Sequence, residues 1–186
     1  MSKAIVRPLE SRDFEALMRL EEDVFAATGE STLGPYYIRL CCEFFAESCF
    51  LAEVDGEPVG YLLSFVNRGE AYCTTLAVIP RFQRSRVTLE LLRAFMRRIV
   101  DHVDVCWFTV TEDNVAARSL HAMLGARETE VRSEFYGKGD KRIVSRIDRA
   151  TFEALRPKYE RLGLVERRVE APVSGEHLRA SLSEVA

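Results

Sequence analysis

The stretch RFQRSRVTLELL, residues 81–92, joins a strand-like segment to a helix-like segment. Before it, EAYCTTLAVIP (residues 70–80) is rich in apolar and β-branched residues and stops at a proline. After it, apolar side chains recur along one face of TLELLRAFMRRIVDHV (residues 88–103), which is the spacing of an amphipathic helix. The first turn of a helix has unpaired N–H groups and a partial positive charge, so this stretch predicts an anion-binding loop.

The flanking segments place this loop in a mixed α/β domain with helices on a central sheet. The Asp55-Gly56 pair between two apolar runs predicts a β-hairpin. The segment 104–114 is almost continuously apolar and β-branched, which predicts a strand covered on both faces. Further strands are expected at 4–9, 128–137 and 141–148, and further helices at 11–25, 35–47 and 114–126. The expected order is β-α-α-β-β-β-α-β-α-β-β. We predict one domain over residues 1–149, followed by a helix and a polar tail over residues 150–186.

Composition narrows the function classes. The formal net charge of the 186 residues is −3, which does not indicate binding to nucleic acid or to an anionic membrane. No apolar stretch reaches the ~18 residues of a membrane span, and the N-terminus lacks the apolar core of a signal peptide, so a cytoplasmic protein is expected. The five cysteines include no CxxC pair and there are three histidines, so we expect reduced, buried thiols and no metal site.

A second motif follows the next predicted strand. Residues 114–125 read N-x-x-A-x-x-L-H-x-x-x-G, through Asn114, Ala117, Leu120, His121 and Gly125. Together with LAVIP (residues 76–80) and QRSRVT (residues 83–88), this motif resembles the GNAT superfamily of acyl-CoA-dependent N-acetyltransferases. The likeness in element order covers residues 4 to about 148. The resemblance implies a central, mostly antiparallel sheet flanked by helices, acetyl-CoA as acyl donor, and a homodimer.

The resemblance also implies which residues bind the cofactor. They are Leu76, Ala77, Val78, Gln83, Arg84, Ser85, Arg86, Val87, Thr88, Asn114 and Ala117. The family's loop pattern is Gln/Arg-x-x-Gly-x-Gly/Ala, and here Arg86 and Thr88 stand at the two small positions. If a glycine there serves by adopting positive φ, its replacement costs on the order of 1 to 2 kcal/mol. If it serves by close backbone approach, side-chain bulk is the obstacle. Guanidinium groups of Arg81, Arg84 and Arg86 can offset this by gripping phosphate, or they form a solvated surface.

His121 stands where the family more often has tyrosine, a residue able to protonate the departing thiolate. A protonated imidazole is a competent acid toward a thiolate; the alternative is that His121 only packs the helix. Glu70 is a candidate base for the amine, with Glu30 and Glu43 as others, although each also suits a solvated surface. Tyr36, Tyr37 and Tyr72 are candidates for the acceptor pocket, together with Glu30. A covalent acyl-enzyme on Cys73 is not expected, because that thiol has no evident histidine partner.

The predicted function is transfer of an acetyl group from acetyl-CoA to a primary amine of a small molecule or amino acid. A weaker likeness of residues 31–61 to diaminobutyrate acetyltransferases makes a small diamine one candidate acceptor. Three alternatives stay open. The loop without glycine favours a degenerate domain that senses acyl-CoA or binds a partner. A basic loop also suits an acyl carrier protein as donor. Within the enzyme class, the acceptor can instead be a protein N-terminus or a lysine.

Overall fold

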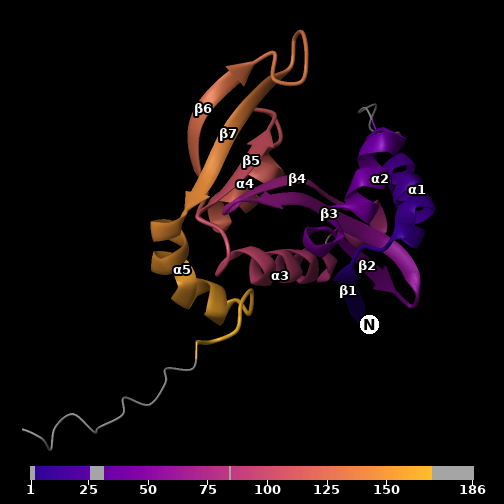
Figure 1. The fold of residues 1–186 in the computed structure, drawn as a ribbon, viewed down its shortest axis with the longest axis horizontal. Helices are drawn as coiled ribbons and strands as arrows, with labels where there is room; N and C mark the ends of the chain where they lie inside the picture. The colour runs from indigo at the N-terminus through magenta and orange to yellow at the C-terminus, as the bar shows by residue number, and fades with distance from the viewer. Residues whose placement is uncertain (1–2, 26–31, 84, 169–186) are drawn as a thin grey trace, which may run out of the picture.

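The computed structural model describes residues 3–25, 32–83 and 85–168 (Figure 1). Its strands are β1 (Ala4–Pro8), β2 (Phe50–Val54), β3 (Glu57–Asn67), β4 (Glu70–Val78), β5 (Val105–Val110), β6 (Arg127–Ser133) and β7 (Lys141–Asp148). Its α-helices are α1 (Phe14–Phe25), α2 (Pro35–Glu43), α3 (Val87–Ile99), α4 (Val115–Met123) and α5 (Arg149–Arg161). The expected order of strands and helices is confirmed.

The seven strands form one sheet in the order β1-β2-β3-β4-β5-β7-β6. Every neighbouring pair is antiparallel except β4 and β5, so the predicted mostly antiparallel sheet is confirmed. The hairpin between β2 and β3 turns at Asp55 and Gly56, whose φ angles are 53° and 81°. Two consecutive positive φ angles are what a type I′ hairpin turn requires, which is why an Asp-Gly pair predicts it.

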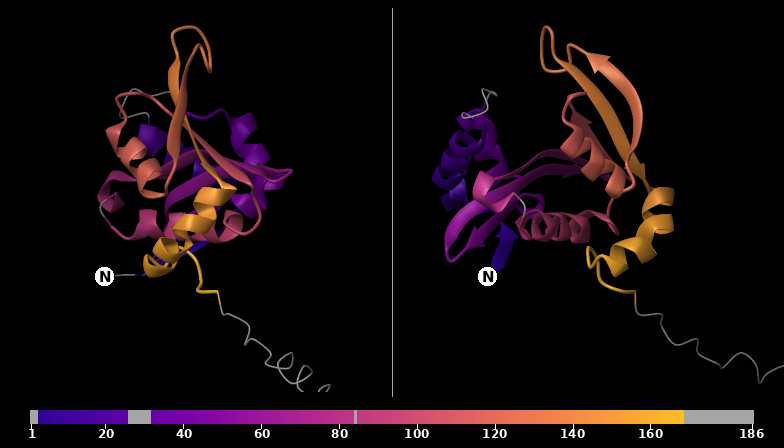
Figure 2. Two further views of the ribbon diagram at one scale, coloured as in Figure 1. Left: turned by 90° about the vertical axis from the view of Figure 1, so that its left-hand side faces the viewer. Right: turned by 180° about the vertical axis from the view of Figure 1, so that it is seen from behind.

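Helices cover both faces of the sheet (Figures 1 and 2). On one face α3 buries Leu91, Phe95 and Met96 against the sheet, and α5 adds Phe152 and Tyr159 to the same core. On the other face α1 and α2 form a second core with β2, β3 and β4. The sheet is therefore the middle of three layers, and its two faces have separate cores.

Strand β5 corrects one expectation from the sequence. It is fully buried on one face only: Cys106, Phe108 and Val110 are buried, whereas the alternating Trp107 and Thr109 are half-buried. The layer of α1 and α2 packs over β2 to β4 and does not extend to β5. This face of β5 is left to the β6–β7 hairpin, and it stays partly open.

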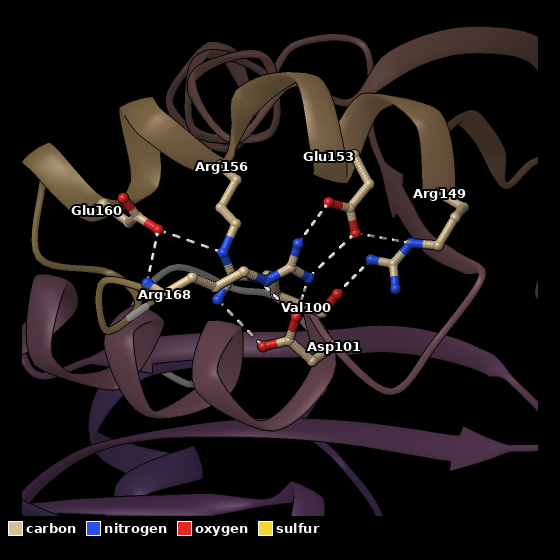
Figure 3. A network of polar contacts seen from close by, with 7 residues as sticks. All are labelled: Val100, Asp101, Arg149, Glu153, Arg156, Glu160 and Arg168. Atoms are coloured by element: carbon tan, nitrogen blue, oxygen red, sulfur yellow. Dashed lines mark hydrogen bonds and ion pairs between the residues drawn. The ribbon is translucent and has the colours of Figure 1, made fainter. Parts of the chain in front are cut away.

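The C-terminal helix is part of the main core. Beyond Phe152 and Tyr159, a polar network joins α5 to the end of α3 (Figure 3). Asp101 accepts hydrogen bonds from Arg156 at 2.7 Å and from Arg168 at 2.8 Å. The split at residue 149 stays a prediction about domain organisation, and α5 contributes Phe152 and Tyr159 to the core formed by the preceding residues.

Within the described residues, no helix is both long and apolar enough to cross a membrane. All five cysteines are free thiols, and four of them are buried.

Candidate active site

The sheet opens between its two parallel strands. Residues Glu70–Cys73 of β4 pair with Val105–Phe108 of β5, and beyond this point the two strands separate (Figure 1). A bulge at Thr74 marks the separation, because Leu63 of β3 faces Thr75 while Ser64 faces Cys73. From Thr74 to Val78, strand β4 pairs with β3 on one side, and on the other side it has no partner strand among the described residues. Alternate backbone N–H and C=O groups of this segment are therefore free to bind an extended ligand.

Three predicted cofactor residues, Leu76, Ala77 and Val78, lie on this free segment of β4. The chain then turns through a short 3₁₀ turn, η4 (Pro80–Phe82), into the N-terminus of α3. The side chain of Gln83 donates a hydrogen bond to the carbonyl oxygen of Val78 at 3.2 Å. This contact holds the loop against the end of β4. The predicted phosphate loop therefore lies at the open end of the gap between β4 and β5, which we call the splay.

The loop does not need glycine for its backbone. Arg86 has φ −73° and ψ −7°, an ordinary right-handed helical conformation, and Thr88 lies inside α3. The cost expected for a non-glycine residue at positive φ therefore does not arise at either position. Ser85 shapes the turn instead: its hydroxyl donates to the carbonyl oxygen of Phe82 at 2.7 Å and accepts from the N–H of Val87 at 3.2 Å.

Within the described residues, the start of α3 has free backbone amides and an exposed arginine side chain. The first hydrogen bond of the helix runs from the N–H of Glu90 to the carbonyl oxygen of Arg86, so the amides of Thr88 and Leu89 have no acceptor within the helix. The side chain of Arg86 is exposed and forms no ion pair within the part of the chain that the structure describes. Arg81 is already paired with Glu57 at 3.2 Å. Arg84 lies outside the described residues.

Helix α4 places His121 over β5. Asn114 begins the helix, its side chain accepting a hydrogen bond from the N–H of Ala117 at 3.0 Å. The ring of His121 lies on the ring of Phe108, with 4.5 Å between centroids and 32° between planes. Burial lowers the pKa of His121 from 6.5 to about 4, against the opposing effect of the nearby Glu128 charge. The ring is therefore neutral at neutral pH, and the protonated acid suggested from the sequence is not its resting form.

Hydroxyl groups gather on the opposite, partly open face. The Tyr72 hydroxyl lies 2.6 Å from both Thr109 Oγ1 and the Tyr136 hydroxyl. Beside them, Tyr37 donates to Thr74 Oγ1 at 2.6 Å. Burial raises the pKa values of Tyr72 and Tyr37, so both phenols stay neutral. Two predicted acceptor residues, Tyr37 and Tyr72, are thus on this face beside the bulge.

Sequence reasoning missed Thr109 and Tyr136. Alternation along β5 places Thr109 on the face opposite Phe108, a signal that the sequence carries once the strand is accepted. Tyr136 follows β6 in the hairpin turn, and only the sheet order brings it to Tyr72. No local pattern predicts that contact.

Other predicted residues are not brought to this site. Glu70 is exposed at the start of β4, four residues before the bulge, or roughly 13 Å along the strand at about 3.3 Å per residue. Tyr36 is 77% exposed on α2. Glu43 binds Ser11 and Arg39. Glu30 lies outside the described residues. Burial raises the pKa of the Cys73 thiol to about 12. The thiol is therefore protonated at neutral pH and is a poor nucleophile.

A buried carboxylate that the sequence did not reveal holds the residues that lead into α2. Glu21 of α1 is 1% exposed. It accepts a hydrogen bond from the N–H of Leu33 at 2.6 Å and another from the hydroxyl of Tyr61, which is fully buried on β3. Leu33 comes two residues before α2. Glu21 therefore connects the segment that leads into α2 with Tyr61 of the sheet.

The family model named Acetyltransferase (GNAT) family matches residues 14–126. An uncharacterized N-acetyltransferase, MJ1530, of Methanocaldococcus jannaschii is 27% identical over 146 residues, covering 75% of this chain and 88% of the relative. Two solved structures share the fold. Diaminobutyrate acetyltransferase EctA from Paenibacillus lautus, in complex with L-2,4-diaminobutyric acid and coenzyme A, has a TM-score of 0.64 at 20% identity, covering 78% of this chain and 95% of that one. Arabidopsis thaliana Naa50, in complex with the bisubstrate analogue CoA-Ac-MVNAL, has a TM-score of 0.68 at 15% identity, covering 78% and 98%.

The separated strands β4 and β5 and the N-terminus of α3 all lie within the residues that the family model matches. The chain belongs to the acetyltransferase (GNAT) family. The predictions of a GNAT fold and of an N-acetyltransferase are confirmed.

Proposed function

We propose that this chain transfers an acetyl group from acetyl-CoA to a primary amine at the splay between β4 and β5. The observation that carries the proposal is the free edge of β4 from Thr74 to Val78, which leads directly to unpaired amides at the start of α3. An extended, amide-bearing arm suits the strand edge, and a diphosphate suits the helix N-terminus. Coenzyme A has both an amide-bearing pantetheine arm and a diphosphate, and the free edge of β4 leads directly to the start of α3, which supports the proposal.

The residues divide the work as follows. The amides of Thr88 and Leu89, with the guanidinium of Arg86, hold the diphosphate. Backbone groups of β4 pair with the pantetheine arm, and one free N–H near Leu76 polarises the thioester carbonyl. The loop without glycine is compatible with this, because the backbone of Arg86 is unstrained and its side chain adds a charge.

The amine approaches from the face of Tyr72, Thr109 and Tyr136. It must lose a proton before attack, because an ammonium group has no lone pair. The hydroxyls of Tyr72, Thr109 and Tyr136 orient the amine and relay its proton to water. They act as neutral groups, because burial raises the pKa of Tyr72 and keeps it from ionising. His121 lies on the other side of β5, and its proposed contribution is a hydrogen bond from the neutral ring to the departing sulfur. A cytoplasmic location and a homodimer stay predictions.

A small molecule or amino acid is the first candidate acceptor, in keeping with the likeness to a diaminobutyrate acetyltransferase. The open face of β5 favours a second candidate, the N-terminus of a peptide chain. Tyr136 is 61% exposed, so the hydroxyl cluster is reached from outside by a group attached to a larger body. The likeness to a structure holding a peptide-containing analogue supports testing it.

The test combines calorimetric titration with acetyl-CoA and a thiol-release assay. We expect saturable binding, and release of free thiol with at least one acceptor among L-2,4-diaminobutyrate, other small amines and a library of short peptides. Binding without release would favour an acyl-CoA sensor. No binding at millimolar acetyl-CoA, together with release from an acyl carrier protein thioester, would move the donor to the carrier protein.

A further inference from the structure

A small cavity lies behind His121, between α4 and the sheet. Its volume is about 30 Å³, and its wall includes Val110, Arg118, His121, Glu128 and Ser145. This volume is too small for a substrate group. A single water molecule needs roughly 10 to 15 Å³ of such space, so one water fits.

Two side-chain polar atoms of the residues in this wall have no hydrogen-bond partner within the described part of the chain. They are Nδ1 of His121 and Oγ of Ser145, and both are buried. Among the described residues, one other buried side-chain atom shares this state, Nε of Arg149, which lies 3.9 Å from Glu153. An unpaired buried polar group destabilises the fold, so two in one cavity need an explanation.

The register of the sheet explains why the two atoms share one cavity. Ser145 of β7 stands directly opposite Phe108 of β5, and Glu128 of β6 stands opposite Ser145. His121 covers Phe108 from α4. Arg118 and Glu128 already bind each other at 2.9 Å. The unmet hydrogen-bonding capacity therefore belongs to His121 and Ser145.

We propose that one ordered water molecule occupies this cavity and links Ser145 Oγ to His121 Nδ1, which makes Ser145 a positioning residue for His121. Packing on Phe108 sets the plane of the imidazole but does not distinguish its two orientations, which are related by a half-turn flip about the Cβ–Cγ bond. A hydrogen bond to Nδ1 removes this freedom, because flipping the ring would place a carbon atom against the water. The other ring nitrogen, Nε2, is then held in one direction. Burial also keeps the ring neutral, so it has one N–H and its tautomer matters.

The catalytic part of this inference rests on the proposed function, whereas the water itself does not. A crystal structure of the full chain at a resolution that shows ordered water should reveal one within about 2.7 to 3.2 Å of both atoms. An empty cavity, or Nδ1 bound to a protein atom, would overturn the proposal. In solution, the imidazole nitrogen resonances of His121 should report one neutral tautomer, and Ser145→Ala should shift or broaden the Nδ1 resonance. Ser119→Ala is the matched control, since Ser119 is exposed on the same helix and away from the cavity.

Kinetics separate the two claims. Ser145→Ala should lower kcat by about fivefold, the equivalent of one hydrogen bond, with KM for acetyl-CoA changed by less than about twofold. His121→Phe should lower kcat at least as far. If His121→Phe leaves kcat unchanged, the proposed role of His121 in transfer is wrong. The presence of the water is then decided by the electron density and by the nitrogen resonances of His121. If Ser145→Ala leaves the Nδ1 resonance unchanged, the link through water is wrong whatever the kinetics show.

Discussion

The buried pair of Glu21 and Tyr61 provides a test of how α1 is held to the sheet. Tyr61→Phe removes one hydroxyl and retains the ring, so the change creates almost no cavity. Glu21 then keeps the N–H of Leu33 at 2.6 Å but loses its other donor. With the carboxylate 1% exposed, water cannot replace that donor without opening the packing between α1 and the sheet.

A hydrogen bond to a charged group contributes about 1.5 to 3 kcal/mol. We therefore expect Tyr61→Phe to lower the free energy of unfolding by about 2 kcal/mol, a factor of roughly 30 in the folding equilibrium. Tyr37→Phe is the matched control. Its hydroxyl binds the neutral, part-buried Thr74, so the expected loss is about 1 kcal/mol or less.

The assay is urea unfolding at pH 7, followed by far-ultraviolet circular dichroism. A double-mutant cycle with Glu21→Leu isolates the pair, because Tyr61→Phe should cost nearly nothing once the acceptor is gone. A loss below about 0.5 kcal/mol for Tyr61→Phe alone, or the same loss in both backgrounds, would show that the hydroxyl–carboxylate contact does not hold α1 to the sheet.

Three further predictions concern the site. Arg86→Ala should weaken acetyl-CoA binding by about fivefold in calorimetry at low salt. Arg81→Ala should weaken it less, because that side chain already pairs with Glu57. Equal effects would show that the exposed Arg86 side chain contributes no more to binding than the paired Arg81. Tyr136→Phe should raise KM for the amine acceptor several-fold while KM for acetyl-CoA stays constant in steady-state kinetics; an unchanged KM for every acceptor would place the amine elsewhere. The pKa of His121 is lowered in the folded state from 6.5 to about 4, so the unfolded chain binds the extra proton between these values. Folding stability should therefore fall as pH drops through that window, and His121→Phe should flatten this dependence in urea unfolding at pH 5 and 7; a parallel decline in both proteins would mean that His121 is not buried as a neutral ring.

The order of strands and helices followed from local patterns. Apolar spacing predicted α3, the Asp-Gly pair predicted the β2–β3 hairpin, and Asn114 with Gly125 bounded α4. These features depend on neighbours in the chain, which is why one sequence is enough to find them. The segment predicted to bind phosphate was located in the same way, because its place depends on a strand stop and a helix start.

The backbone of Arg86 was not predictable, since either sign of φ suits a loop residue, and the structure gives φ −73° without strain. The partial exposure of the face of β5 that carries Trp107 and Thr109 depended on how far α1 and α2 extend over the sheet. The pKa of His121 depended on packing against Phe108 rather than on its position in a motif.

The sequence by itself determined the family, the strand and helix order and the place of the loop between β4 and α3, because periodicity and turn chemistry are local properties. Only the tertiary structure decided which hydroxyls meet beside the bulge, which amides stay free and what lies behind His121. Those contacts join residues up to 64 positions apart, Tyr72 and Tyr136 among them, and the pairing of strands that brings them together is a property of the whole sheet.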